Sequence, residues 1–173
     1  MGTAVVIGGG IIGASMAWRL AQAGMAVTVI ERNALASGAT AATFGWLTSS
    51  SAVEPSVAYP ACYRELKVRG IDEYLRISAE LDDSSWLHVS GHVEWDAAPD
   101  GPDRIARKFA DLQSWGYSAE LLPVRELAAL EPDLVPPDDL DAFIYYPREG
   151  YIDPGALVGR LISRAVGVGA TIR

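Results

Sequence analysis

The chain has 173 residues, of which 50% are hydrophobic and 21% are charged, a composition typical of a globular protein with a substantial core. Its 14 basic and 22 acidic residues give a net charge of −8, which argues against nucleic acids and anionic membranes as partners, because both require basic patches. The single cysteine, Cys62, excludes an internal disulfide, and its simplest interpretation is a small buried hydrophobic residue. We expect a cytoplasmic protein, attached peripherally to the inner face of the membrane if it is a dehydrogenase.

The first predicted unit is a strand, a helix and a second strand. The apolar run Ala4–Ile7 predicts a parallel strand that is buried on both faces. A helical period follows from Ile11 to Ala23, and Gly24 closes that helix. The β-rich stretch "VTVIE" then supplies a second strand that ends at Glu31. The connection through the helix should be right-handed, as in nearly all such units.

The turn between this strand and helix contains Gly8, Gly10 and Gly13 in the spacing GxGxxG. In a dinucleotide site the first glycine permits the tight turn, the second leaves room for the pyrophosphate, and the third lets helix and strand pack closely. The pyrophosphate lies on the helix N-terminus, where free N–H groups and the helix dipole offset its charge. Glu31 follows 18 residues after Gly13 and can accept hydrogen bonds from a ribose diol. Both NAD and FAD present such a diol, so the turn alone does not separate them.

Further elements follow along the chain, after a small-residue segment at 33–51 that predicts an extended loop. They are a helix from about Ser56 to Leu81, one or two strands in 85–96, an amphipathic helix at 103–116, a strand near 119–122, a short helix at 124–132 and a strand at 142–147. Candidate buried positions in the first of these helices are Tyr59, Tyr63, Leu66, Ile71, Tyr74 and Leu75. Gly70 is a candidate break in that helix.

The last predicted helix begins at Asp153, which caps it, with Pro154 at its first position. Its apolar stripe is Leu157, Leu161, Ala165 and Val168. Gly169 ends this helix before a final strand at Thr171–Arg173. Because a finished domain rarely stops on a strand that belongs inside a sheet, we expect the sheet to be incomplete at the C-terminus.

Two stretches together resemble the FAD-dependent oxidoreductases of the D-amino-acid oxidase type, which include glycine and sarcosine oxidases and D-amino-acid dehydrogenases. The first is the GxGxxG pattern with Ala17, Gly24 and "VTVIER", followed directly by "ASGATAATFG". The second is "RELAALEPDL" followed by "AFIYYPREGYIDPGALVGRLISRAVGVGATIR". Full enzymes of this type are about twice as long, so the chain resembles their N-terminal half.

The resemblance implies FAD as the cofactor. It places Ser37, Gly38, Thr40 and Thr43 along the phosphates and the ribityl chain, and Gly45 with Trp46 near the flavin ring. No His or Cys occurs between Glu31 and Tyr59, so we expect the flavin to be non-covalent. The complete set of expected cofactor residues is Gly8, Gly10, Ile12, Gly13, Glu31, Arg32, Ser37, Gly38, Thr40, Thr43, Gly45 and Trp46.

The expected fold class is α/β, with a Rossmann-like FAD-binding sheet and part of an α+β substrate domain. We assign residues 1–55 and 141–173 to a partial FAD-binding domain. Residues 56–140 are assigned to a helical segment and part of the substrate domain. A missing C-terminal half, or a second chain, would complete this fold.

The resemblance implies oxidation of a C–N bond in an amino acid or secondary amine, with hydride passing to the flavin. We nominate no acid–base catalytic residue, and expect the isolated chain to turn over poorly or not at all. Two alternatives remain open: a stand-alone nucleotide-binding module without catalysis, and an NAD-linked dehydrogenase that uses the same turn. A metal site built from His88, His92, Glu94 and Asp96 is disfavoured, because their setting is that of polar surface residues.

Overall fold

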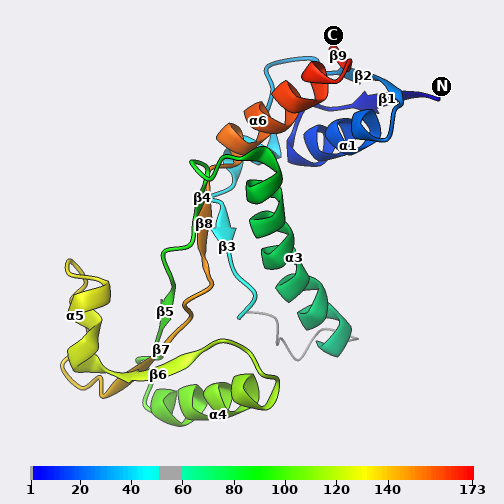
Figure 1. The fold of residues 1–173 in the computed structure, drawn as a ribbon. Coiled ribbons are helices and arrows are strands. Elements are labelled where there is room, and N and C mark those ends of the chain that lie inside the picture. The colour runs from blue at the N-terminus through cyan, green and yellow to red at the C-terminus, as the bar shows by residue number, and fades with distance from the viewer. Residues whose placement is uncertain (1, 51–59) are drawn as a thin grey trace. The chain divides into compact units, whose positions relative to one another are not determined.

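The computed structural model describes residues 2–50 and 60–173 (Figure 1). The chain divides into two compact units. Unit 1 consists of Met1–Leu47, Asp72–His88 and Tyr151–Arg173, and unit 2 of Thr48–Ile71 and Val89–Gly150. We describe each unit by itself.

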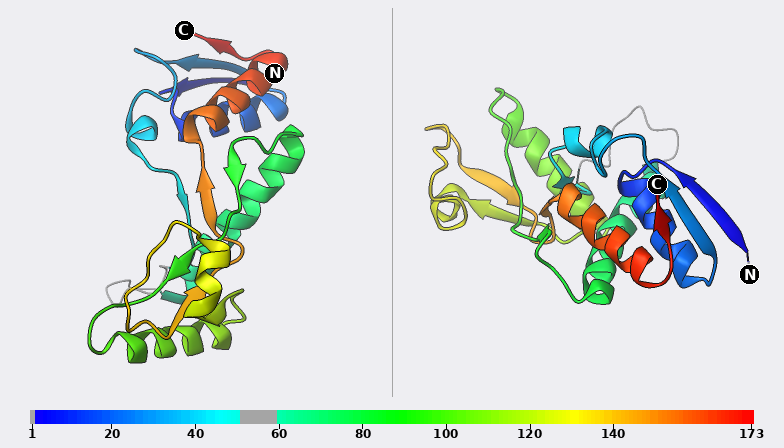
Figure 2. Two further views of the ribbon diagram at one scale, coloured as in Figure 1. Left: turned by 90° about the vertical axis from the view of Figure 1, so that its left-hand side faces the viewer. Right: turned by 90° about the horizontal axis from the view of Figure 1, so that it is seen from above.

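Unit 1 is built on a parallel three-stranded sheet. Its strands are β1 (Thr3–Ile7), β2 (Ala26–Ile30) and β9 (Thr171–Ile172), in the order β1-β2-β9. Two helices, α1 (Ile11–Gln22) and α6 (Pro154–Gly167), lie on the same side of these strands (Figures 1 and 2). The predicted strand–helix–strand unit and the final strand are therefore confirmed.

The core of unit 1 forms where these two helices meet each other and the sheet. Small residues on α1 allow the close approach, since Ala14 and Ala17 are completely buried. The predicted stripe of α6 is buried at Leu157, Leu161 and Ala165, but Val168 lies beyond the helix and is exposed. Asp153 caps α6 as predicted, because its Oδ1 accepts a hydrogen bond of 2.9 Å from the Ala156 amide.

The prediction that β1 is buried on both faces is wrong. Side chains along a strand point alternately to opposite faces, and here Val6 is half-buried while Val5 and Ile7 are 60% and 86% exposed. The reason is that, among the described residues, α1 and α6 cover only one face of the sheet (Figure 2).

The segment predicted as an extended loop contains two short elements, α2 (Ala39–Ala42) and β3 (Trp46–Leu47). Strand β3 joins a second sheet in the order β3-β8-β4, with β8 at Gly150–Ile152 and β4 at Leu87–His88. The Ile152 amide donates a hydrogen bond of 2.8 Å to the Gly45 carbonyl oxygen. Elements this short depend on partners that are distant in sequence, so no local sequence pattern predicts them.

Helix α3 (Pro60–Leu81) runs without a break at Gly70, and the predicted positions from Ser56 to Tyr59 lie outside the described residues. Among its described side chains, Ile71, Ile77 and Leu81 in the C-terminal part are buried and Tyr74 is half-buried, at spacings of three to four residues. The remaining predicted buried positions are wrong, because Tyr63, Leu66 and Leu75 are exposed. The expectation of a buried cysteine is also wrong, since Cys62 on this helix is exposed.

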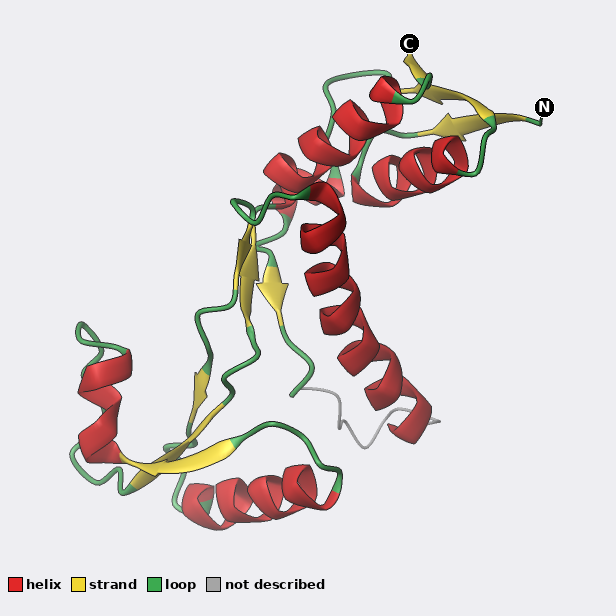
Figure 3. Cartoon of the chain, in the orientation of Figure 1, coloured by secondary structure: helices red, strands yellow, loops and turns green. Residues whose placement is uncertain are grey.

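Unit 2 contains an antiparallel sheet in the order β5-β7-β6, formed by Val93–Glu94, Ala142–Tyr145 and Glu120–Pro123. Helix α4 (Gly101–Ser114) packs on this sheet (Figure 3). Ile105 and Leu112 lie on the inner face of α4, in a cluster with Ile144 and Tyr146. A 3₁₀ turn (Val124–Glu126) and α5 (Leu127–Leu130) follow β6.

A completely buried carboxylate, that of Glu149, organises another part of unit 2. Its Oε1 accepts hydrogen bonds from the Ser49 amide (3.0 Å), the Ser50 amide (2.7 Å) and the Tyr117 hydroxyl (2.7 Å). Its Oε2 accepts from the hydroxyls of Thr48 (2.8 Å) and Ser50 (3.1 Å). Five donors thus compensate the loss of hydration of one buried charge. Burial also raises the pKa of the Tyr117 hydroxyl above its ordinary value.

The acidic residues that we considered as metal ligands have other partners. Glu94 binds the Lys108 ammonium and accepts a hydrogen bond of 2.7 Å from Tyr146, while Asp96 binds Arg104. Over residues 2–50 and 60–173, no group of three or more His, Cys, Asp or Glu side chains converges on a metal position. No helix in the described part of the chain is both long and apolar enough to cross a membrane.

Candidate functional site

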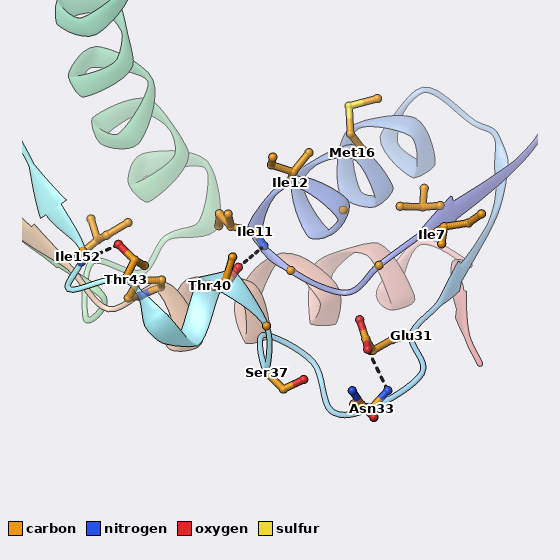
Figure 4. Close-up of a pocket in the computed structure, with 18 of the residues that line it drawn as sticks. Ile7, Ile11, Ile12, Met16, Glu31, Asn33, Ser37, Thr40, Thr43 and Ile152 are labelled. Atoms are coloured by element: carbon orange, nitrogen blue, oxygen red, sulfur yellow. Dashed lines mark hydrogen bonds between the residues drawn. The ribbon is translucent and has the colours of Figure 1, made fainter.

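A cavity of about 1010 Å³ in unit 1 opens at the carboxyl ends of β1 and β2. The first turn of α1 and the segment from Glu31 to Leu47 form most of its wall (Figure 4). Tyr74, Ile152 and Pro154 complete the wall from other parts of the sequence. Open α/β sheets bind their ligands at this edge, outside the carboxyl ends of the strands.

The glycine-rich turn brings strand and helix together at this edge. Gly8 has a φ of +101°, a conformation that residues with a Cβ rarely adopt, so the turn out of β1 requires glycine. A Cβ on Gly13 would stand 1.9 Å from the Gly8 carbonyl oxygen, so only a hydrogen atom fits between helix and turn. A Cβ on Gly10 would stand 3.0 Å from the Thr40 hydroxyl oxygen. The two outer glycines are therefore explained by backbone geometry alone.

The N-terminus of α1 directs toward the cavity amides that have no hydrogen-bond partner within the helix. The first intrahelical bond runs from the Ala14 amide to the Gly10 carbonyl at 2.9 Å, so the preceding amides have no partner within the helix. The Ile11 amide donates to the Thr40 hydroxyl at 3.1 Å, and Ile12 and Gly13 follow it at the cavity wall (Figure 4). Together with the helix dipole, these amides favour an anion such as a phosphate.

Glu31 lies directly after β2, and backbone amides hold its side chain. Its Oε2 accepts from the Gly9 amide at 2.7 Å, and its Oε1 accepts from the Asn33 amide at 2.9 Å. The Gly9 amide is the main cause that lowers the pKa of Glu31, and the Asn33 amide and the Arg32 guanidinium lower it further. Each oxygen keeps a second lone pair, so the carboxylate is charged, oriented and still able to accept ribose hydroxyl groups.

The aromatic end of the cavity lies at β3. Trp46 is 43% exposed there and lies near Phe44, with 6.1 Å between the ring centroids. The hydrogen bond from Ile152 to Gly45 fixes the chain next to Trp46. The cavity therefore has a polar end, made by Glu31 and the α1 N-terminus, and an aromatic end.

All twelve sequence-predicted cofactor residues line this one cavity. They are Gly8, Gly10, Ile12, Gly13, Glu31, Arg32, Ser37, Gly38, Thr40, Thr43, Gly45 and Trp46. The individual roles of these residues stay predictions. Sequence reasoning missed several further lining residues, namely Ile7, Met16, Asn33, Tyr74, Ile152 and Pro154. Ile7 and Met16 follow the period of their strand and helix, whereas Tyr74 and Ile152 carry no local signal.

Known proteins resemble this chain over nearly its whole length. Glycine oxidase of Geobacillus kaustophilus is 25% identical over 171 residues, which cover 96% of this chain and 44% of that protein. Mitochondrial dimethylglycine dehydrogenase of Rattus norvegicus is 26% identical over 170 residues, which cover 98% of this chain and 19% of that protein.

Solved structures share its fold. Glycine oxidase from Bacillus cereus ATCC 14579 matches with a TM-score of 0.79 at 26% identity, over 99% of this chain and 45% of that one. L-amino acid deaminase from Proteus vulgaris matches with a TM-score of 0.78 at 18% identity, over 99% of this chain and 39% of that one. At this low identity the match shows a shared fold alone. The chain thus spans less than half the length of these relatives. Residues 3–173 match the family described as FAD dependent oxidoreductase, and the chain belongs to that family.

Proposed function

We propose that this chain is the nucleotide-binding part of an oxidoreductase that oxidises the C–N bond of an amino acid or secondary amine with FAD. Membership of a family of FAD-dependent oxidoreductases favours this function over an NAD-linked dehydrogenase or a binding module without catalysis. The names of the relatives, glycine oxidase and dimethylglycine dehydrogenase, suggest small amino acids and their N-methyl derivatives as substrates.

One observation carries the proposal: a single cavity of about 1010 Å³ gathers all the expected cofactor residues. Its polar end suits a dinucleotide, because the α1 amides would hold the pyrophosphate and Glu31 would accept the adenosine ribose hydroxyls. Its aromatic end at Trp46 would meet the flavin ring. An extended dinucleotide needs both ends in one continuous cavity.

The protein residues orient the cofactor and exclude water, and the redox chemistry belongs to the flavin. When bound, FAD supplies an acceptor for the hydride that leaves the carbon next to nitrogen, while the substrate becomes an imine and releases a proton. Thr40 would stand beside the pyrophosphate, since its hydroxyl already touches the Ile11 amide. No His or Cys occupies residues 32–50, so we propose that the flavin is not covalently attached.

The match to just under half of the two glycine oxidases suggests that further catalytic machinery lies outside these 173 residues. We propose that it comes from further sequence of the same polypeptide or from a second chain. The isolated chain would then bind the ADP part of FAD and turn over poorly or not at all. A cytoplasmic location is part of the same proposal, consistent with a single cysteine and no internal disulfide.

The decisive experiment is spectroscopic. The full-length protein should purify with flavin absorption bands, and acid precipitation should release all of its flavin into the supernatant. Anaerobic addition of glycine or dimethylglycine should bleach the flavin bands if either is a substrate. A colourless protein that binds NAD but not FAD would overturn the proposal, and flavin left on the precipitate would overturn the non-covalent assignment.

A substitution tests the cavity directly. Gly10→Leu should abolish flavin loading, because a Cβ there already approaches the Thr40 hydroxyl at 3.0 Å and a longer side chain would cover the amides. The matched control is Gly159→Leu on α6, where a Cβ meets no atom within 4 Å. Flavin content per protein, measured by absorbance, should fall only in the first variant. Equal flavin content in both would contradict the assignment of the pyrophosphate site.

A further inference from the structure

Unit 2 contains a second cavity, of about 380 Å³, which the proposed function does not use. It lies between the first turns of α4 and the sheet of this unit. Its walls are mainly apolar, and the main contributors are Pro102, Ile105, Ala106, Leu121, Pro137 and Leu140. A volume of this size falls within the range of small-molecule sites, which are about 300–1,000 Å³.

The cavity follows from how α4 packs. Leu121 of β6 is paired with Ile144 of β7, and Ile144 lies in the cluster that α4 covers through Ile105 and Leu112. Pro102, Ile105 and Ala106 line the cavity from the first turns of α4, and residues 137–141, which precede β7, form another part of its wall. The cavity therefore lies where α4, β6 and this loop meet.

Its charged groups are carboxylates. Asp139 and Asp141 line the cavity, both are exposed, and neither forms an ion pair with a cation among the described residues. The third carboxylate, Asp96, is already bound to Arg104, so it contributes little net charge. No Lys or Arg is among the residues that line this cavity, although Arg125 follows Val124, whose amide donates to the Asp141 carbonyl oxygen at 2.9 Å. The N-terminus of α4 contributes about half a positive charge, which is less than the two negative charges of Asp139 and Asp141.

We propose that this cavity binds a small organic cation, a protonated amine carried on a compact apolar group. The apolar group would fill the space beside Ile105 and Leu121, and the ammonium would meet Asp139 and Asp141 at the cavity mouth. The occupant is a free small molecule, because a volume of about 380 Å³ matches a compact ligand. This site is separate in sequence from every residue assigned to the flavin.

The test uses 1-adamantylamine as the probe, with 1-adamantanol and 1-adamantanecarboxylate as neutral and anionic controls. The probe has no hydrogen on the carbon that bears nitrogen, so an amine-oxidising enzyme cannot consume it. Binding to the full-length protein is measured by ligand-observed NMR titration. We expect the amine to bind about 5- to 10-fold more tightly than the alcohol, as for one or two exposed ion pairs, and the carboxylate to bind least. Raising the salt from 20 to 500 mM should reduce this preference.

Two pairs of variants locate the binding. Ala106→Phe fills the cavity and should abolish binding, whereas Ala110→Phe, one turn later on the same exposed side of α4, should leave it unchanged. The double variant Asp139→Asn with Asp141→Asn should bring the amine to the affinity of the alcohol. The matched control is Glu131→Gln with Asp133→Asn, two exposed acids outside the cavity wall.

Equal affinity for the amine and the alcohol would overturn the assignment of cation recognition. Binding that survives Ala106→Phe, or no binding of any probe, would overturn the site itself. A Lys-rich peptide that binds more tightly than the amine, and competes with it, would show a protein partner and contradict the small-molecule assignment. None of these outcomes depends on flavin content. The proposal of an amine site can therefore be wrong while the proposed function is right, and the proposed function can be wrong while the amine site is right.

Discussion

Unit 1 and unit 2 each contain a glutamate that accepts hydrogen bonds from two backbone amides. The two glutamates differ in their burial and in the total number of hydrogen bonds that they accept. Glu31 lies at the edge of a large cavity and accepts only the Gly9 and Asn33 amides, which leaves part of its hydrogen-bonding capacity unused. Glu149 is completely buried and accepts five hydrogen bonds, two from amides and three from hydroxyls. One carboxylate remains available to a ligand, and the other is committed to the fold.

From this comparison we expect the number of donors around a carboxylate to distinguish a binding role from a structural one better than its charge does. A buried carboxylate needs a full set of donors, because an unsatisfied charge in the interior is costly. A carboxylate that binds a ligand must be held in position while part of its hydrogen-bonding capacity stays unused. Substitutions at the two sites should therefore affect different measurements.

The largest effect on stability should come from Glu149→Leu. This change leaves the amides of Ser49 and Ser50, both buried, without an acceptor, at a total cost of about 3–5 kcal/mol. Glu149→Gln should cost about 1 kcal/mol, because its oxygen can still accept from the amides and its NH₂ can donate to the hydroxyls. Midpoints of urea unfolding compare the two variants. A leucine variant as stable as the wild type would show that the buried network contributes nothing.

The next effect concerns binding at Glu31. Glu31→Ala removes the acceptor for the ribose hydroxyls, and we expect the FAD affinity of the protein to fall by about 10- to 100-fold, as for lost hydrogen bonds to a charged group. Unfolding of the flavin-free protein should change much less than FAD binding, because the two amides can turn to water. Isothermal titration of flavin-free protein measures the affinity, and an unchanged value would exclude a role in ribose binding.

A smaller effect should appear with pH. The amides of Gly9 and Asn33 lower the pKa of Glu31 below its ordinary value of 4.5 in the folded chain. The stabilisation that this carboxylate provides is therefore complete above pH 4.5 and is lost as the pH falls through the lowered pKa. The difference in unfolding temperature between the wild type and Glu31→Gln should shrink on going from pH 6 to pH 3. A constant difference over that range would contradict the hydrogen-bonding pattern.

The smallest effect should come from a third carboxylate, which holds only one amide. Asp153→Ala removes the cap of α6 and should lower stability by about 1 kcal/mol. Asp153→Ser should retain most of that stability, since a serine hydroxyl also accepts from the helix amide. The loss in unfolding midpoint should be larger for Glu149→Leu than for Asp153→Ala, since Glu149 accepts five hydrogen bonds and Asp153 accepts one from an amide. Equal losses would show that donor number does not rank these two sites.

The polar end of the cavity in unit 1 could be predicted because its rules are local. Gly8, Gly13 and Glu31 follow from turn geometry, helix packing and strand length within about 30 residues. The cap of α6 and most of its stripe are local for the same reason, and the structure confirms them at Asp153, Leu157, Leu161 and Ala165.

The remaining features of the fold and of the candidate site depend on residues that are distant in sequence. The contribution of Ile152 and Tyr74 to the cavity, and the donors around Glu149, join segments about 30 to 100 residues apart, which no spacing rule reveals. Burial was mispredicted where the sequence does not say how much of an element is covered: β1 has one open face, and the first half of α3 exposes Tyr63 and Leu66. A pattern identifies an apolar side chain, but neighbouring elements decide whether it is covered.

The exposed position of Cys62 has a practical consequence. It is the only thiol in these 173 residues and belongs to unit 2, whereas the proposed flavin site lies in unit 1. A maleimide dye attached there and a bound flavin would form a donor–acceptor pair for energy transfer. The transfer efficiency would then report the separation of the two units in solution, and any change in it when substrate is added.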